Sequence, residues 1–196
     1  MPASQLSLFS PPSRPLPEGF AYHPDAVSVE EEFRLLAEIA PLPFKEFQFH
    51  GFEGKRRVVS FGWRYDYTEN KAVPADPIPP FLREVSRKIQ AAAGFVLPDL
   101  EQVLVTEYAP GAAIGWHKDR PVFGNVMGLS LASPCTFRLR KSSGEGGWER
   151  VSLRCEPRSA YFLADAARWK WEHSIPPVES LRYSITFRNR RQTSDR

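Results

Sequence analysis

Residues 182–188 read RYSITFR, and the stretch alternates between polar and apolar side chains without interruption. Because successive side chains of a β-strand project from opposite faces, each set occupies a face of its own. The polar face holds Arg182, Ser184, Thr186 and Arg188. The other face holds Tyr183, Ile185 and Phe187. Such a strand suits the wall of a β-barrel whose interior is lined for a polar ligand.

Residues 116–119 read WHKD and form the second informative segment. Val103–Tyr108 reads as a strand, and after a Pro-Gly break Ile114–Asp119 resumes an extended pattern. His117 and Asp119 are two residues apart. We therefore expect both side chains to project from the same face of this strand.

A distant histidine extends this pair to a metal-binding pattern. His117 and Asp119, followed far downstream by His173, match the two-histidine, one-carboxylate facial triad of non-haem Fe(II). Such a triad leaves positions on the metal open for a co-substrate and O2. Arg182 and Arg188 could bind an acidic co-substrate there, because a guanidinium is a bidentate partner for a carboxylate. Each residue alone has an ordinary alternative, such as a surface ion pair or a core histidine, but their order together favours an iron site.

In this order the motifs resemble a known family. The segments TEYAPGAAIGWHKD (106–119), WEHSIPP (171–177) and LRYSITFR (181–188) are similar to the AlkB-like branch of the Fe(II)/2-oxoglutarate dioxygenases. The resemblance covers about Val103 to Arg190, and more loosely the chain from Phe20. It implies a mainly β fold with flanking helices, a double-stranded β-helix (jelly roll). It also implies Fe(II), 2-oxoglutarate and O2 as cofactors.

The same resemblance implies roles for individual residues. The catalytic iron ligands would be His117, Asp119 and His173. Arg182 would pair with the distal carboxylate of 2-oxoglutarate, with Tyr108 beside it, and Arg188 would lie near the end closer to the metal. The rest of the co-substrate pocket would be formed by Leu104, Thr106, Ile114 and Ser184. Thr106 stands where the family usually has an asparagine, so a hydroxyl replaces an amide.

Residues 60–67, SFGWRYDY, are the candidate substrate contact, because they resemble the aromatic lid that AlkB-like enzymes place over a flipped base. Trp63 is the leading stacking residue, and Tyr65 or Tyr67 would form a second wall. The alternative is that these aromatic rings only pack the outer sheet onto the helices. Arg120-Pro121 follow the metal motif where base-demethylating members often have an acidic residue, which removes a polar contact to an alkylated base.

The favoured function is oxidative demethylation of N-alkylated nucleic-acid bases, that is, repair of alkylation damage, with DNA favoured over RNA. The enzymatic alternative is 2-oxoglutarate-dependent oxidation of a modified tRNA base or of a protein side chain. A third alternative is a binding protein that keeps the fold without turnover. The intact triad and the arginine pair count against that third alternative.

Composition agrees with one β-rich domain. The chain has 196 residues, enough for a full core, and 19 prolines with short alternating runs favour a loop-rich β architecture. No stretch approaches a membrane span, and no signal peptide is evident. Cys135 and Cys155 are too few for a disulfide scaffold and are expected to be buried thiols. We therefore expect a cytoplasmic monomer.

The net charge is only +3, so there is no global basic field for nucleic acid. Local basic clusters occur at residues 55–57, 138–141 and 188–191. They could contact phosphates, although each could equally be a solvated face.

We expect an oxygenase domain at residues 20–191, between a Pro/Ser-rich lead (1–19) and a frayed C-terminus (192–196). A capping box from Ser28 to Glu31 predicts a helix to about Ala40, and a second helix runs from Phe81 to about Ala93, ended by Gly94. A β-hairpin-like region is expected from Phe47–Phe52 and Val58–Tyr67 around Glu53-Gly54-Lys55. A turn is expected at Ser142–Gly147.

The lead contains one short motif. Gln5-Leu6-Ser7-Leu8-Phe9 resembles the peptide by which bacterial repair and replication proteins dock on the sliding clamp. Leu8 and Phe9 would fill apolar pockets, and nearby prolines would keep the lead extended. The alternative is that these side chains fold back onto the barrel as an N-terminal anchor.

Overall fold

The computed structural model describes residues 15–49, 52–144 and 146–191. The lead motif Gln5–Phe9 and residues 192–196 lie outside this part of the chain. The helices are α1 (Val29–Ile39), α2 (Pro80–Ala93) and α3 (Asp165–Trp169). The strands are β1 (Phe20–His23), β2 (Lys45–Phe49), β3 (Phe52–Phe61), β4 (Trp63–Asp66), β5 (Lys71–Pro74), β6 (Gln102–Tyr108), β7 (Ile114–His117), β8 (Phe123–Leu131), β9 (Cys135–Ser142), β10 (Trp148–Cys155), β11 (Ala160–Leu163), β12 (Glu172–Ile175) and β13 (Arg182–Arg190).

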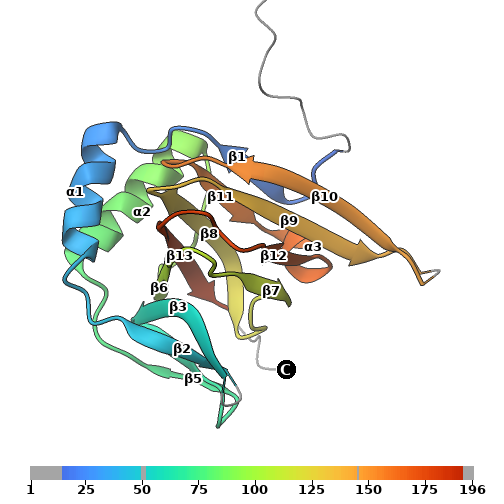
Figure 1. The fold of residues 1–196 in the computed structure, drawn as a ribbon, viewed down its shortest axis with the longest axis horizontal. Coiled ribbons are helices and arrows are strands. Elements are labelled where there is room, and N and C mark those ends of the chain that lie inside the picture. Colours follow the sequence, from blue (N-terminus) through green and yellow to red (C-terminus); the bar gives the residue numbers. More distant parts are fainter. Residues whose placement is uncertain (1–14, 50–51, 145, 192–196) are drawn as a thin grey trace, which may run out of the picture.

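Two antiparallel sheets form the body of the molecule (Figure 1). The larger has seven strands in the order β1-β11-β8-β13-β6-β3-β2, and the smaller has four in the order β10-β9-β12-β7. Their crossed order and facing arrangement are those of the jelly roll, so the predicted fold class is confirmed. A separate β4–β5 ribbon lies beside the large sheet (Figure 1).

The large sheet has a hydrophobic core on each face, and β13 shows how they are divided. Ile185 and Phe187 belong to the core that α1 and α2 cover, and Tyr183 packs against it. Arg182 and Arg188 come from the opposite face and are also buried. The second core fills the space between the two sheets and includes Phe137, Leu139 and Tyr161. The predicted division of the strand into a packed face and a polar face is therefore confirmed.

Helices α1 and α2 begin and end as their sequences predict. Ser28 caps α1 through the amide of Glu31, whose carboxylate accepts from the amide of Ser28 in return. Gly94 ends α2 at a φ of 67°, a conformation that favours glycine. An ion pair between Glu31 and Lys88 joins the two helices, which lie side by side (Figure 1).

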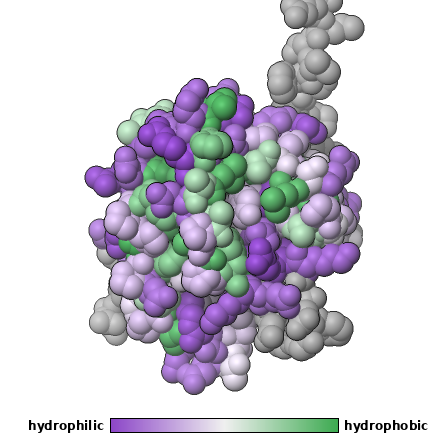
Figure 2. All heavy atoms as spheres, turned by 60° about the vertical axis from the view of Figure 1, so that its left-hand side comes forward, coloured by the Kyte–Doolittle hydropathy of each residue, from purple (hydrophilic) through white to green (hydrophobic). Residues whose placement is uncertain are grey.

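Glu32 ties α1 to the rest of the fold. Its carboxylate accepts from the amide of Ala132 at 2.8 Å and from Arg158 at 3.1 Å. Viewed from the helix side, hydrophobic residues form a band through a largely hydrophilic surface (Figure 2). None of the helices in residues 15–49, 52–144 and 146–191 combines the length and the apolar composition that a membrane crossing requires.

The structure corrects the predicted hairpin. β2 and β3 pair antiparallel, but β3 runs through residues 53–55, where the turn was expected. The expected strand Val58–Tyr67 is interrupted at Gly62, after which β4 pairs with β5 instead. Gly62 has a φ of 75°, and a Cβ there would lie 2.0 Å from the carbonyl oxygen of Glu101. Glycine is required at this close approach, and the chain leaves the large sheet there.

The turn at residues 142–147 is confirmed: the amide of Ser143 donates to the carbonyl of Gly147 at 3.1 Å, and β9 pairs with β10 on either side. Cys135 and Cys155, directly opposite each other in this pair, are free and buried as expected.

Candidate active site

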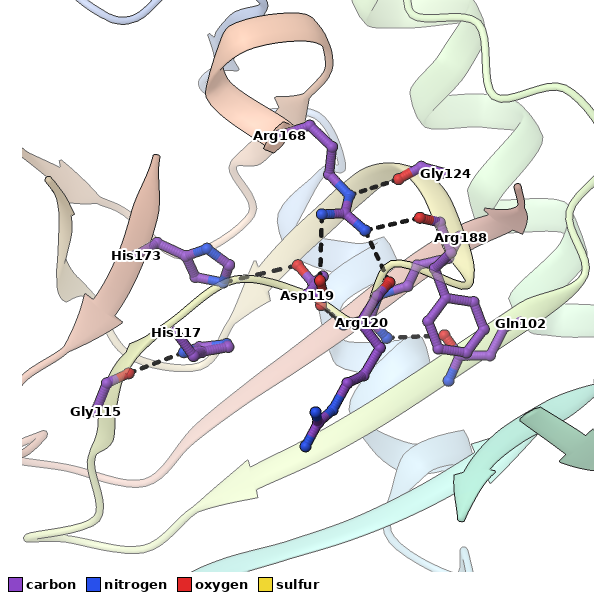
Figure 3. A network of polar contacts seen from close by, with 10 residues as sticks. Gln102, Gly115, His117, Asp119, Arg120, Gly124, Arg168, His173 and Arg188 are labelled. Atoms are coloured by element: carbon purple, nitrogen blue, oxygen red, sulfur yellow. Dashed lines mark hydrogen bonds and ion pairs between the residues drawn. The ribbon is translucent and has the colours of Figure 1, made fainter. Parts of the chain in front are cut away.

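The three side chains of the predicted triad lie close together at one end of the space between the sheets. His117 is the last residue of β7, and His173 lies directly opposite it on β12. Their ring centroids are 4.2 Å apart. Asp119 follows β7, and its Oδ2 lies 3.8 Å from Nε2 of His173 (Figure 3). The small sheet therefore brings together two histidines and a carboxylate that are up to 56 residues apart in the sequence.

Burial and neighbouring charges set the ionisation of these groups. Burial lowers the pKa of His173 to about 3, assisted by the neighbouring His117. Burial also lowers the pKa of His117. Burial acts to raise the pKa of the Asp119 carboxyl, but Arg188 and the two histidines outweigh it and hold that pKa well below its usual range. At neutral pH the site thus offers two neutral imidazoles and one carboxylate, the protonation state in which such groups bind a metal.

The orientation of His117 also suits a ligand. Its Nδ1 lies 2.8 Å from the carbonyl oxygen of Gly115 (Figure 3). A carbonyl accepts but does not donate, so this contact favours the tautomer with the proton on Nδ1. The lone pair of Nε2 is then available for a cation.

The triad is a group of neighbours and not a preformed coordination sphere. Across the described ranges, no three His, Cys, Asp or Glu side chains are arranged as a ready metal site. Oδ1 of Asp119 accepts from Nη2 of Arg188, and Oδ2 faces His173. Arg188 also donates from Nη1 to Gln102 at 2.8 Å, which joins β13 to β6 below the triad. Binding of an ion here requires small adjustments of the side chains around Asp119.

Arg168 of α3 holds the loop that carries Asp119, a role that sequence reasoning missed. The side chain is 2 % exposed. Its guanidinium donates to four backbone carbonyls, at 3.3 Å to Asp119, 2.9 Å to Arg120, 2.7 Å to Phe123 and 2.6 Å to Gly124. In Figure 3 it lies directly over this loop. No local pattern links residue 168 to residues 119–124, so only the folded chain reveals the contact.

Arg182 is fully buried and incompletely paired. Its Nε donates to Oγ of Ser130 at 3.2 Å, and the ring of Tyr108 lies 5.0 Å from its guanidinium carbon. Neither Nη1 nor Nη2 has a hydrogen-bond partner among the described residues. The neighbouring Cys135 is a weak acceptor at best, and its thiol pKa is lowered to about 7 by Cys155 and then by Arg182. A buried guanidinium with two free N–H edges fits the carboxylate of an acidic ligand.

The other residues expected around that ligand line the same space. In the β6–β13 pair, Tyr108 lies opposite Arg182, Thr106 opposite Ser184 and Leu104 opposite Thr186. Residues directly opposite share a face of the sheet. Ile114 comes from the facing sheet, where β7 pairs it with Ile175, and it packs against the core between the sheets. The structure thus gathers the expected set between the two sheets.

The family profile of the 2OG-Fe(II) oxygenase superfamily matches residues 41–188. The chain belongs to this superfamily. Its oxygenase chemistry uses Fe(II), 2-oxoglutarate and O2, and the buried, half-paired Arg182 and the His-Asp-His group described above fit these cofactors. The predicted enzyme class, a dioxygenase, is confirmed.

Related proteins place the oxygenase in the AlkB-like branch. An uncharacterized protein of Acanthamoeba polyphaga mimivirus is 29% identical over 187 residues, covering 87% of this chain and 84% of that protein. The alkylated DNA repair protein ALKBH8 homolog of Arabidopsis thaliana is 28% identical over 196 residues, covering 87% of this chain and 55% of that protein. The oxygenase therefore spans little more than half the length of the plant relative.

A solved structure shows the same fold. The structure of OsALKBH1 superposes with a TM-score of 0.69 at 14% identity, covering 91% of this chain and 100% of that chain. At this identity the likeness supports the jelly roll of the oxygenase and not its substrate.

The three aromatic residues expected to contact substrate lie on or next to the β4–β5 ribbon. The rings of Tyr65 and Tyr67 meet edge to face, with centroids 5.1 Å apart. The guanidinium of Arg120 lies over both, at 4.7 Å from Tyr65 and 4.8 Å from Tyr67. The tyrosines are therefore linked to the residue next to Asp119. Trp63 is partly buried, as Tyr65 is, and the guanidinium carbon of Arg190 lies 4.1 Å from the centroid of its ring.

Proposed function

We propose that this dioxygenase oxidatively demethylates N-alkylated bases of nucleic acid, with DNA preferred over RNA. The observation that supports it is the placement of the β4–β5 ribbon. Tyr65 and Tyr67 lie against Arg120, and Arg120 directly follows Asp119. Flat rings and a cation at the edge of a metal site are suited to a base that leaves its stack and to its phosphate.

The proposed mechanism gives each residue a task. The iron would be held by His117, Asp119 and His173. When bound, the iron would supply oxidation of a C–H bond by O2, with 2-oxoglutarate converted to succinate and CO2. A hydroxylated N-methyl group then leaves as formaldehyde and frees the amine. Arg182 binds the distal carboxylate of 2-oxoglutarate through its two free N–H edges. Arg188 orients Asp119, and Arg168 holds the loop behind it.

A product screen tests the proposal. The iron-loaded enzyme is incubated with 2-oxoglutarate and DNA or RNA oligonucleotides that each carry one N-methylated base. We expect mass spectrometry to show the loss of one methyl group from the oligonucleotide, together with an equal amount of formaldehyde. The Asp119→Ala variant should show neither change. If no oligonucleotide changes while 2-oxoglutarate is still consumed, the substrate class is wrong and the oxygenase assignment stands. Methylated tRNA and protein serve as the alternative substrates in the same screen.

Two further proposals concern the setting of the enzyme. We place it in the cytoplasm as a monomer, which agrees with two free, buried thiols. We also propose that Gln5–Phe9, outside the described residues, binds a sliding clamp. Residues 1–19 as a labelled peptide should bind a bacterial clamp in fluorescence anisotropy. No binding at high micromolar clamp would refute this partner.

A further inference from the structure

A basic pocket opens beside Asp119, and three of its side chains, Lys118, Trp169 and Arg191, have no role in the chemistry above. Its volume is about 260 Å³. It is lined by Lys118, Asp119, Arg120, Pro121, Arg168, Trp169 and Arg191. Four of these side chains are cationic, and the only carboxylate, Asp119, is already paired with Arg188. The pocket therefore has an excess of positive charge.

Among the described residues, the cations of the pocket form no ion pair with an acidic side chain. In the part that the structure describes, no carboxylate lies within ion-pair distance of the side chains of Lys118, Arg120 or Arg191. The guanidinium of Arg168 donates to backbone carbonyls, and among the described residues it forms no direct ion pair with a carboxylate. Lys118 and Arg191 are exposed and can turn their donors toward a ligand.

Aromatic rings accompany these charges. Trp169 is 39% exposed, and its ring centroid lies 4.2 Å from the guanidinium carbon of Arg168 and 5.2 Å from that of Arg191. On the other side, Arg120 bridges from the pocket to Tyr65 at 4.7 Å. In Figure 3 the side chain of Arg120 extends away from Arg168. The rings and cations thus form a continuous track from Trp169 past Asp119 to the β4–β5 ribbon.

We infer that this pocket binds a backbone phosphate of a single-stranded nucleic acid next to the nucleotide that is oxidised, with a flanking base on Trp169. The inference rests on the proposed function and specifies its substrate: a strand, not an isolated nucleotide or a protein. Lys118 and Arg191 contact the phosphate, and Arg120 is shared between the phosphate and the tyrosines. Alternating cations and exposed rings are the features by which proteins hold single strands without reading their sequence.

Binding of a fluorescein-labelled, unmodified 12-nucleotide DNA strand, measured by anisotropy over a range of salt, tests the inference. The plot of log K against log salt has a negative slope, and each lost phosphate contact reduces the magnitude of that slope by about 0.7. At 0.1 M salt the same loss weakens binding roughly fivefold. Lys118→Ala and Arg191→Ala should each show this change, and their combination about twice the change in slope. Trp169→Ala should weaken binding about fivefold or more with little change in slope.

Arg87→Ala is the matched control, because Arg87 is an exposed arginine on α2, away from the pocket. It should bind the strand like the unmodified protein, and thermal unfolding should confirm that all variants are folded. Equal losses in Arg87→Ala and Arg191→Ala would overturn the inference. So would full competition by inorganic phosphate at matched ionic strength, which would indicate a small-anion site only.

The outcomes separate the two proposals. If the unmodified protein demethylates oligonucleotides but the pocket variants bind the strand normally, the phosphate pocket is wrong and the proposed function stands. If strands bind through the pocket but no methylated base is oxidised, the pocket stands and the proposed reaction is wrong. Absence of any strand binding overturns the pocket, whatever the product screen shows.

Discussion

Arg182 has a buried guanidinium whose Nη1 and Nη2 have no hydrogen-bond partner among the described residues. Replacing this side chain is therefore the most direct test of the co-substrate site. Arg182→Ala should weaken 2-oxoglutarate binding by about 2–5 kcal/mol, the usual cost of truncating one partner of a buried charge pair. Arg182→Lys should restore only part of this, because an ammonium lacks the planar fork. Calorimetry with Mn²⁺ in place of Fe(II) measures both affinities. Unchanged affinity in the two variants would place the carboxylate elsewhere.

The carboxylate of Asp119 turns one oxygen to Arg188 and the other to His173. Asp119→Ala should abolish iron-dependent consumption of 2-oxoglutarate while the fold is kept, because neither hydrophobic core includes this residue. It also removes the acidic partner of Arg188, whose side chain is only 10% exposed, so we expect some loss of stability. Circular dichroism and thermal unfolding check the fold. Residual turnover in Asp119→Ala would argue against this carboxylate as a ligand.

Among the elements, the β3–β6–β13 junction has a charged contact that should make stability depend on pH. Glu107 of β6 accepts from Arg57 at 2.7 and 2.8 Å and from the hydroxyl of Tyr183 at 2.9 Å. The hydrogen bonds from Arg57 are the largest cause that lowers the pKa of Glu107. Because its pKa is lower in the folded protein, ionised Glu107 stabilises the fold at any pH above its pKa in the unfolded chain. This stabilisation is lost as the pH falls through the pKa of the folded protein.

Glu107→Gln should therefore be less stable than the unmodified protein at pH 7, and the difference should shrink below about pH 4. The effect should not exceed about 1 kcal/mol, because half of the Arg57 side chain is exposed and water screens the pair. Urea unfolding of both proteins at pH 7 and at about pH 3 measures it. A difference that is constant with pH would mean that the lost packing, and not the ionised pair, matters.

The β4–β5 ribbon is the element on which substrate binding depends. Tyr65→Ala should raise KM for a methylated oligonucleotide about fivefold or more, which corresponds to the loss of one stacked base. Tyr65→Phe keeps the ring and should retain most of the binding. Steady-state formaldehyde release gives KM and kcat separately. Equal effects of the two substitutions would assign the role to the hydroxyl and not to stacking.

For the whole molecule, ligands that bind between the sheets should stabilise the fold. At about a hundred times its Kd, each of the two ligands, Mn²⁺ and 2-oxoglutarate, should add about 2.7 kcal/mol to the free energy of unfolding. Each should also raise Tm by several degrees. A chelator should reverse the gain. Arg182→Ala should keep the metal increment and lose the part due to 2-oxoglutarate. An equal 2-oxoglutarate increment in that variant would show that the acid binds without Arg182.

The sequence by itself determined those features that depend on local patterns. The alternation at residues 182–188 decided which face of β13 is packed, and the structure confirms it. The capping box at Ser28 and the left-handed Gly94 decided where helices begin and end. Both signals are carried by residues within one strand or one turn of each other, so no distant partner is needed to interpret them.

Only the tertiary structure decided how distant residues share charges and hydrogen bonds. The pairing of Arg188 with Asp119 joins residues 69 positions apart, and Arg168 reaches the same loop from α3. The turn of the chain at Gly62 depended on the carbonyl of Glu101, a contact that no pattern near Gly62 contains. Such contacts arise because sheet pairing brings remote segments within a few ångströms, where burial makes every polar group depend on the partner it meets.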